Sequence, residues 1–146
     1  MFDMDEVAQL ALLSDSYLFR ALDDEGRRNL AAAGTSRAFE AGEVIVRLGE
    51  PGDSFFMVKR GKVRVLGGSE AQPVELASLG RGSCFGEMAL LAGTPRTATV
   101  EAAEPSEVVV YDKGDVDAVL ASYPDVRQAL ELLAGKRRLA TTARTG

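Results

Sequence analysis

Two charged residues that could hold a small anion stand on either side of a short apolar run in the stretch FGEMALLAGTPRTATV. Glu87 precedes the run and Arg96 follows it. The run itself, residues 88–92, has the length of about one or two helical turns, whose first backbone N–H groups lack intrahelical partners and attract anions. Gly86 lets a ligand approach this backbone without meeting a Cβ. The stretch therefore predicts a socket for an anion, and the planar fork of Arg96 suits phosphate oxygens.

Arg96 is expected to need an anionic partner. If it begins a strand directly after Pro95, Ala98 and Val100 share its face, and the guanidinium points toward an apolar interior. An unpaired charge in such a place is costly. We therefore expect an anion there, either a ligand or a carboxylate of the chain.

Glu87 needs a different role, because a carboxylate beside a phosphate repels it. It fits if it accepts hydrogen bonds from ligand hydroxyls and also holds Arg96 in place. Backbone N–H groups, an arginine and a hydroxyl-reading carboxylate together indicate a sugar phosphate. Taken singly, Glu87 is explained as a first-turn acid, and Arg96 as a surface charge or the salt-bridge partner of Glu87. Only their joint spacing favours a binding site.

The sequence contains no histidine, which removes whole classes of catalytic chemistry. A Ser-His-Asp triad and a His-ligated metal both need imidazole. We therefore expect no enzyme, no metal and no cofactor. The 17 basic and 22 acidic residues give a net charge of -5, so no attraction to nucleic acid is expected. Any bound anion must be captured locally.

The remaining composition predicts a cytoplasmic protein. Its only cysteine, Cys84, has no internal disulfide partner and is expected to be a small buried packing residue. The longest apolar run is far shorter than the ~20 residues of a membrane span, and the N-terminus is acidic where a signal peptide is basic. We expect no membrane contact by the chain itself.

Helices are predicted at the beginning of the chain. Apolar residues recur at helical spacing between residues 7 and 33. Asp23 or Asp24 can cap the second of these helices, and Gly34 can end it.

From Thr35 the pattern changes to short runs rich in Val, Ile and Phe, separated by glycine turns. Several short strands at such spacing predict an antiparallel jelly-roll β-barrel. The last strand is expected at residues 107–111. The turn signals between the runs are Ala41-Gly42, Pro51-Gly52, Arg60-Gly61 and Gly67-Gly68.

Helical patterns return after the strands. Asp112 can cap a helix at residues 113–122, and Pro124 fits the first turn of a last helix that runs to about Leu139. We therefore expect a mainly β, α+β fold in one domain over residues 1–146. Its parts are N-terminal helices at 1–34, the barrel at 35–112 and C-terminal helices at 113–140.

The quoted stretch resembles the phosphate-binding cassette of the cyclic nucleotide-binding domain family. The upstream segment FEAGEVIVRLGEPGDSFFMVKRGKVRV is similar to the first strands and glycine turns of that family. The resemblance extends over nearly the whole chain, from about residue 17 to residue 138. It implies a short cassette helix within residues 85–97.

The resemblance also implies roles for the cassette residues. Arg96 would pair with the cyclic phosphate, helped by backbone N–H groups near Gly86 and Ala89. Glu87 would accept a hydrogen bond from the ribose 2′-hydroxyl.

Around these residues, the resemblance implies packing and base contacts. Phe85 and Met88 would pack the cassette against the barrel. Val63 and Val65 would flank the base.

In the family the last helix closes over the base, so residues 132–139 are lid candidates. Arg137 or Arg138 would stack on the purine by a cation–π contact, and a solvated end of the helix is an equally open interpretation of both. Thr97 bears on the choice of nucleotide, because its hydroxyl can accept from the amine of a guanine. We expect a preference for cAMP with cGMP also accepted.

The function expected from this resemblance is a non-catalytic sensor, in which the ligand shifts the C-terminal helix and so signals to an unidentified effector. The alternatives are the sensor portion of a catabolite-activator-like transcription regulator, or of a channel or kinase. The sequence has no room for a helix-turn-helix after the last helix, so we expect the DNA-binding part to be absent or cut away. The apolar terminal helices could form a homodimer or only cover the barrel.

Overall fold

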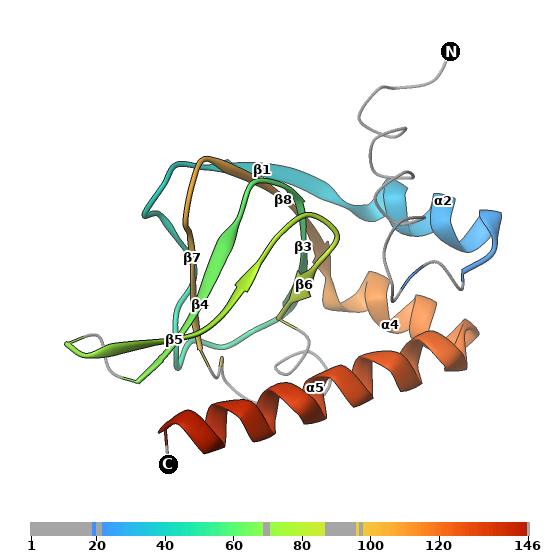
Figure 1. Ribbon diagram of the computed structural model, residues 1–146. Coiled ribbons are helices and arrows are strands. Elements are labelled where there is room, and N and C mark those ends of the chain that lie inside the picture. Colours follow the sequence, from blue (N-terminus) through green and yellow to red (C-terminus); the bar gives the residue numbers. More distant parts are fainter. Residues whose placement is uncertain (1–18, 20–21, 69–70, 87–95, 97, 146) are drawn as a thin grey trace.

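A computed structural model of the chain describes residue 19 and residues 22–68, 71–86, 96 and 98–145, with residue 134 and residues 137–145 described by their backbone alone. A β-barrel occupies one side of the molecule, α2 and α4 lie together at its other side, and α5 passes along both (Figure 1). This arrangement of strands between helices is the one that the sequence predicts.

Within these residues the helices are α2 (Asp24–Ala33), α4 (Lys113–Ser122) and α5 (Pro124–Thr145). Asp23 caps α2 as predicted, because its carboxylate accepts from the backbone N–H of Gly26 at 2.8 Å, and Gly34 takes the C-cap position. The helix expected nearer the N-terminus lies outside the described residues.

Two predictions about the C-terminal helices were wrong in detail. Asp112 stands at the N-cap of α4, but its side chain makes no capping bond. The N–H of Lys113 instead donates to the carbonyl of Asp53 at 2.9 Å, a tertiary partner that sequence does not reveal. Helix α5 runs past Leu139 to Thr145. Alanine and arginine are strong helix formers there, and each threonine costs only a few tenths of a kcal/mol.

The strands form two antiparallel four-stranded sheets, in the orders β1-β8-β3-β6 and β2-β7-β4-β5. The last strand, β8, is one residue longer at each end than predicted. Gly67-Gly68 were expected in a turn, but β4 continues through them, because Gly68 still pairs with Pro73. The strands are β1 (Thr35–Phe39), β2 (Val44–Val46), β3 (Ser54–Arg60), β4 (Val63–Gly68), β5 (Pro73–Leu79), β6 (Cys84–Phe85), β7 (Thr99–Ala102) and β8 (Ser106–Asp112).

Most of β3 and β8 in the first sheet is buried on both faces, which explains why these two strands are nearly continuous apolar runs. Alternate side chains of a strand point to opposite faces. Phe56 packs between the two sheets, whereas its neighbour Phe55 packs against the helices. Val108 and Val109 of β8 divide in the same way. The barrel core and the helical core therefore share this one sheet.

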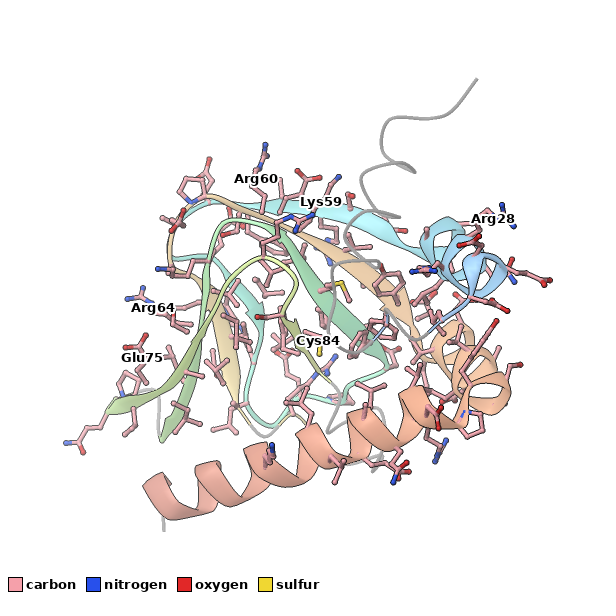
Figure 2. The ribbon with its side chains drawn as sticks, turned by 45° about the vertical axis from the view of Figure 1, so that its right-hand side comes forward. Arg28, Lys59, Arg60, Arg64, Glu75 and Cys84 are labelled. Carbon is pink, nitrogen blue, oxygen red and sulfur yellow. The ribbon has the colours of Figure 1, made fainter. Side chains whose placement is uncertain are left out.

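The helices cover only part of the outer face of the first sheet. Beyond the covered part, charged residues of β3 and β8 form ion pairs on this sheet. Lys59 continues the outward face of β3, and its ammonium lies 3.0 Å from a carboxylate oxygen of Glu107 on β8. Arg60 reaches the other oxygen of Glu107 at 3.1 Å. The bond from Lys59 is the main cause that holds the pKa of Glu107 below its ordinary value. Lys59 and Arg60 lie beside one another at the end of the barrel (Figure 2).

Candidate functional site

Arg96 is buried although it is charged, with 7% of its surface exposed. Its Nη1 donates to the carbonyl of Gly86 at 3.3 Å, and its Nη2 donates to the carbonyl of Ser54 at 3.1 Å. Ser54 begins β3 and Gly86 follows β6, and these two strands are paired. The guanidinium therefore lies at one end of the first sheet, as the sequence predicted for a charge turned inward.

The backbone of Arg96 is held by the loop between β2 and β3. Its N–H donates to the carbonyl of Glu50, and its carbonyl accepts from the N–H of Gly49, both at 2.8 Å. A third bond runs from the N–H of Leu48 to the Thr99 hydroxyl at 3.0 Å. Arg96 was expected to begin a strand, but β7 begins only at Thr99. The loop between β2 and β3 therefore makes the backbone hydrogen bonds to Arg96 that a neighbouring strand would make.

The guanidinium lies over an aromatic ring, which in turn stacks on a second ring. The Cζ of Arg96 is 5.4 Å from the centroid of the Phe56 ring, over that ring. Phe56 in turn stacks on Phe85, with centroids 4.8 Å apart and an interplanar angle of 5°. Phe85 is 2% exposed, which fits its expected role of packing this segment against the barrel. The cation and the two rings form one layered group.

Gly86 is required here by geometry. Its φ is +92°, a conformation that side-chain-bearing residues rarely adopt. A Cβ at this position would lie 2.9 Å from the Arg96 Nη1, 3.0 Å from the Ser54 carbonyl oxygen and 3.2 Å from the Phe56 ring. The sequence suggested that this glycine makes room for a ligand. The structure gives it the further task of making room for the arginine.

The structure thus brings together three of the expected site residues, Phe85, Gly86 and Arg96. Val63 and Val65 lie on one face of β4 and pack in the core between the sheets, Val63 fully buried and Val65 partly exposed. Other expected site residues lie outside the described residues, namely Glu87, Met88, Ala89 and Thr97. Helix α5 passes through positions 137 and 138, but the side chains of Arg137 and Arg138 are likewise outside what is described.

Sequence reasoning missed the groups that hold Arg96 in place. Two of them, Gly49 and Glu50, directly precede the predicted turn at Pro51-Gly52, but neither was given a role at the site. Ser54 takes part through its carbonyl, which every residue type carries. Phe56 belongs to an apolar run whose inward and outward members become distinguishable only when the sheet pairing is known.

Cys84 is buried, as expected for a packing residue, with 3% of its surface exposed. It lies well inside the molecule, away from the labelled surface charges (Figure 2). No group of three or more His, Cys, Asp or Glu residues that could hold a metal ion occurs among the described residues. In the same part of the chain, no helix combines the length and the apolar character needed to cross a membrane.

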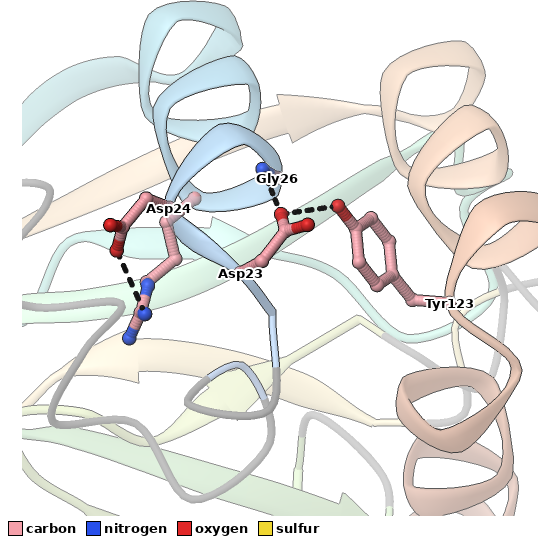
Figure 3. Close-up of polar contacts among 5 residues, drawn as sticks. Asp23, Asp24, Gly26 and Tyr123 are labelled. Carbon is pink, nitrogen blue, oxygen red and sulfur yellow. Dashed lines mark hydrogen bonds and ion pairs between the residues drawn. The ribbon is translucent and has the colours of Figure 1, made fainter.

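A groove of about 420 Å³ lies between α2 and α4, lined in part by Leu30, Val119 and Tyr123. At its end the Tyr123 hydroxyl donates to the Asp23 carboxylate at 2.5 Å, and the same oxygen caps α2 (Figure 3). This bond is the main cause that lowers the pKa of Asp23 and raises the pKa of Tyr123. The described lining of the groove includes none of the expected site residues, so the end of the sheet around Arg96 is the better candidate site.

Residues 36–123 match the model of the cyclic nucleotide-binding domain. The chain is 37% identical over 134 residues to a cyclic nucleotide-gated potassium channel of Mesorhizobium japonicum, which covers 92% of this chain and 36% of the channel. The chain thus spans about a third of that relative's length.

Solved structures agree with this match. The regulatory domain of Toxoplasma gondii PKA, crystallised with cAMP, has a TM-score of 0.83 and 27% identity, covering 91% of this chain and 51% of that chain. The catabolite activator protein of Thermus thermophilus has a TM-score of 0.75 and 30% identity, covering 87% and 60% of the two chains. With its two antiparallel sheets, its flanking helices and these matches, the chain belongs to the cyclic nucleotide-binding domain family.

Proposed function

We propose that this chain is a non-catalytic sensor that binds a purine cyclic nucleotide and pairs the cyclic phosphate with Arg96. The observation that supports this most is a guanidinium only 7% exposed and held at the end of the first sheet. Burial removes competing water, which strengthens the attraction between this guanidinium and an anion that reaches it. The planar fork of its N–H donors matches the oxygens of a phosphate.

Calorimetry with cAMP, cGMP and 5′-AMP tests this proposal on wild type and on Arg96→Leu. Truncating one member of a buried charge pair costs ~3–5 kcal/mol, so the variant should bind more than ~100-fold more weakly. Arg64→Leu is the matched control, because Arg64 is a partly exposed arginine whose Nη2 pairs with Glu101 at 2.9 Å in the other sheet. It should bind as wild type does. Equal affinity of Arg96→Leu and wild type would refute the phosphate site.

We further propose that cAMP is preferred and that cGMP is accepted. The Toxoplasma regulatory domain is described as bound to cAMP, which supports the first part. Thr97, next to Arg96 in the sequence, supports the second, because a hydroxyl can accept a hydrogen bond from the guanine amine. Thr97→Ala should therefore weaken cGMP binding more than cAMP binding. An equal change for both nucleotides would count against this role.

We propose that α5 is the element that moves on binding. Val126 and Leu130 anchor its first turns in the helical core, with 1% and 0% of their surfaces exposed, whereas Leu132 is 63% exposed. A ligand shifts such a helix only if it contacts the two positions differently. Hydrogen exchange with and without cAMP should show changed protection along α5. Identical exchange in both states would contradict the movement.

The effector is proposed to be a channel, a kinase or a transcription regulator, because the relatives include a channel and a catabolite activator protein. We propose that the sensor works in the cytoplasm and that its terminal helices either form a homodimer or only cover the barrel. DNA binding and hydrolysis are the competing functions. A DNA probe slowed by the chain would support the first, and 5′-AMP formed from cAMP would support the second.

A further inference from the structure

We propose that Phe56 is a positioning residue for ligand binding, because its ring holds the Arg96 guanidinium in the orientation that a phosphate needs. The inference rests on the proposed function and adds to it a residue that neither the motif nor its spacing indicates. Phe56 itself is not expected to touch the ligand. Its effect would pass through Arg96.

The first support is the geometry of the layered group. The Arg96 Cζ lies over the Phe56 ring at 5.4 Å from its centroid, and Phe56 stacks on Phe85 at 4.8 Å. All three side chains are buried, with 7%, 5% and 2% of their surfaces exposed. Cation–π attraction is strongest when the partners are removed from water. The ring below Arg96 is thus itself held by a second ring and cannot easily turn away.

The second support is how a guanidinium divides its contacts. Its N–H donors all lie in its plane, so its face is available for a ring while its edge makes hydrogen bonds. In this structure the edge donates to the carbonyls of Gly86 and Ser54, and the Cζ lies over the Phe56 ring. A phosphate would also bind at the edge. The ring can therefore orient Arg96 without competing with the ligand.

The third support is that the sheet fixes the ring. Phe56 pairs with Phe85 across β3 and β6, and with Val110 across β3 and β8. Its neighbour Phe55 points to the opposite face, where it packs edge-on against Phe19 with ring centroids 5.7 Å apart. Phe55 is 0% exposed and belongs to the helical core. It offers a control of the same residue type, on the same strand, whose side chain packs in the other core.

The first test measures cAMP affinity by calorimetry for Phe56→Leu, Phe56→Tyr and Phe55→Leu. Loss of the ring in Phe56→Leu should weaken binding about 5- to 30-fold. Phe56→Tyr keeps a ring and should restore most of this affinity. Phe55→Leu should bind within about twofold of wild type, although it also loses a buried ring. Wild-type affinity in Phe56→Leu, or an equal loss in Phe55→Leu, would overturn the inference.

The second test needs no ligand. Urea unfolding of wild type, Phe56→Leu, Arg96→Leu and the double variant forms a double-mutant cycle, which isolates the coupling between the two side chains. A ring that holds the guanidinium predicts a smaller effect of Phe56→Leu once Arg96 is gone. Strictly additive effects would overturn the inference.

The two tests also separate the inference from the proposed function. If wild type bound neither cAMP nor cGMP, the proposed function would fall, and the unfolding cycle would still decide whether Phe56 holds Arg96. If wild type bound and Arg96→Leu did not, while Phe56→Leu matched wild type, only the inference about Phe56 would fall.

Discussion

Replacing Gly86 with alanine should damage both the stability of the fold and the binding site. Gly86 has a φ of +92°, and alanine in such a conformation is strained by roughly 1–2 kcal/mol. Alanine also lowers the entropy of the unfolded chain, which offsets about 0.4–1 kcal/mol of that strain. The backbone conformation alone therefore predicts a net loss of about 1 kcal/mol in the free energy of unfolding.

The contacts of the added methyl group determine the larger effect. Its Cβ would lie 2.9 Å from the Arg96 Nη1 and 3.0 Å from the Ser54 carbonyl oxygen. The carbonyl belongs to a paired strand, so the arginine is the group that must move. Moving it disrupts hydrogen bonds of a charged group, each worth about 1.5–3 kcal/mol. We expect cAMP affinity to fall about 10- to 150-fold.

Gly82→Ala is the matched control. Gly82 has a nearly equal φ of +87°, and nothing lies within 4 Å of the position its Cβ would take. Urea unfolding should show the backbone loss in both variants and an additional loss only in Gly86→Ala. Calorimetry should show weakened binding only in Gly86→Ala. Equal stability and equal affinity in the two variants would refute the account of Gly86 as the residue that makes room for Arg96.

Three further predictions concern the scaffold. Tyr111→Phe should stabilise the chain by about 1 kcal/mol in urea unfolding, because the buried Tyr111 hydroxyl has no hydrogen-bond partner within the described structure. Ser106→Ala should cost about 1–3 kcal/mol in the same assay, since the hydroxyl of the buried Ser106 accepts from the N–H of Lys62 at 3.0 Å. The lowered pKa of Asp23 means that its bond with Tyr123 adds stability above the ordinary pKa of an aspartate and loses it as the pH falls through the lowered value. Thermal unfolding of Tyr123→Phe should therefore depend less on pH below about pH 4 than that of wild type, and identical profiles would contradict this.

The sequence by itself determined the order and type of the elements. Local signals are enough for this, because a cap such as Asp23, a proline such as Pro124 and the glycine turns act within a few residues of the chain. It also indicated Arg96 and Gly86, since Glu87 and Arg96 stand on either side of a short apolar run that Gly86 precedes, and this joint spacing favours a binding site. The long helix α5 was underestimated because propensity differences of a few tenths of a kcal/mol do not fix where a helix ends.

Only the tertiary structure decided what surrounds the arginine. The carbonyls of Gly86 and Ser54 come from segments far apart in the chain, directly after β6 and at the start of β3, and carbonyls carry no signal of residue type. Phe55 and Phe56 are adjacent and identical in the sequence, yet the pairing of the sheet sends one to the helices and the other to Arg96. Hydrogen bonds, ring contacts and burial depend on distances across the fold. The amino-acid sequence contains the residues that form the site around Arg96. Which of them contact one another is decided only when strands far apart in the chain come together in the fold.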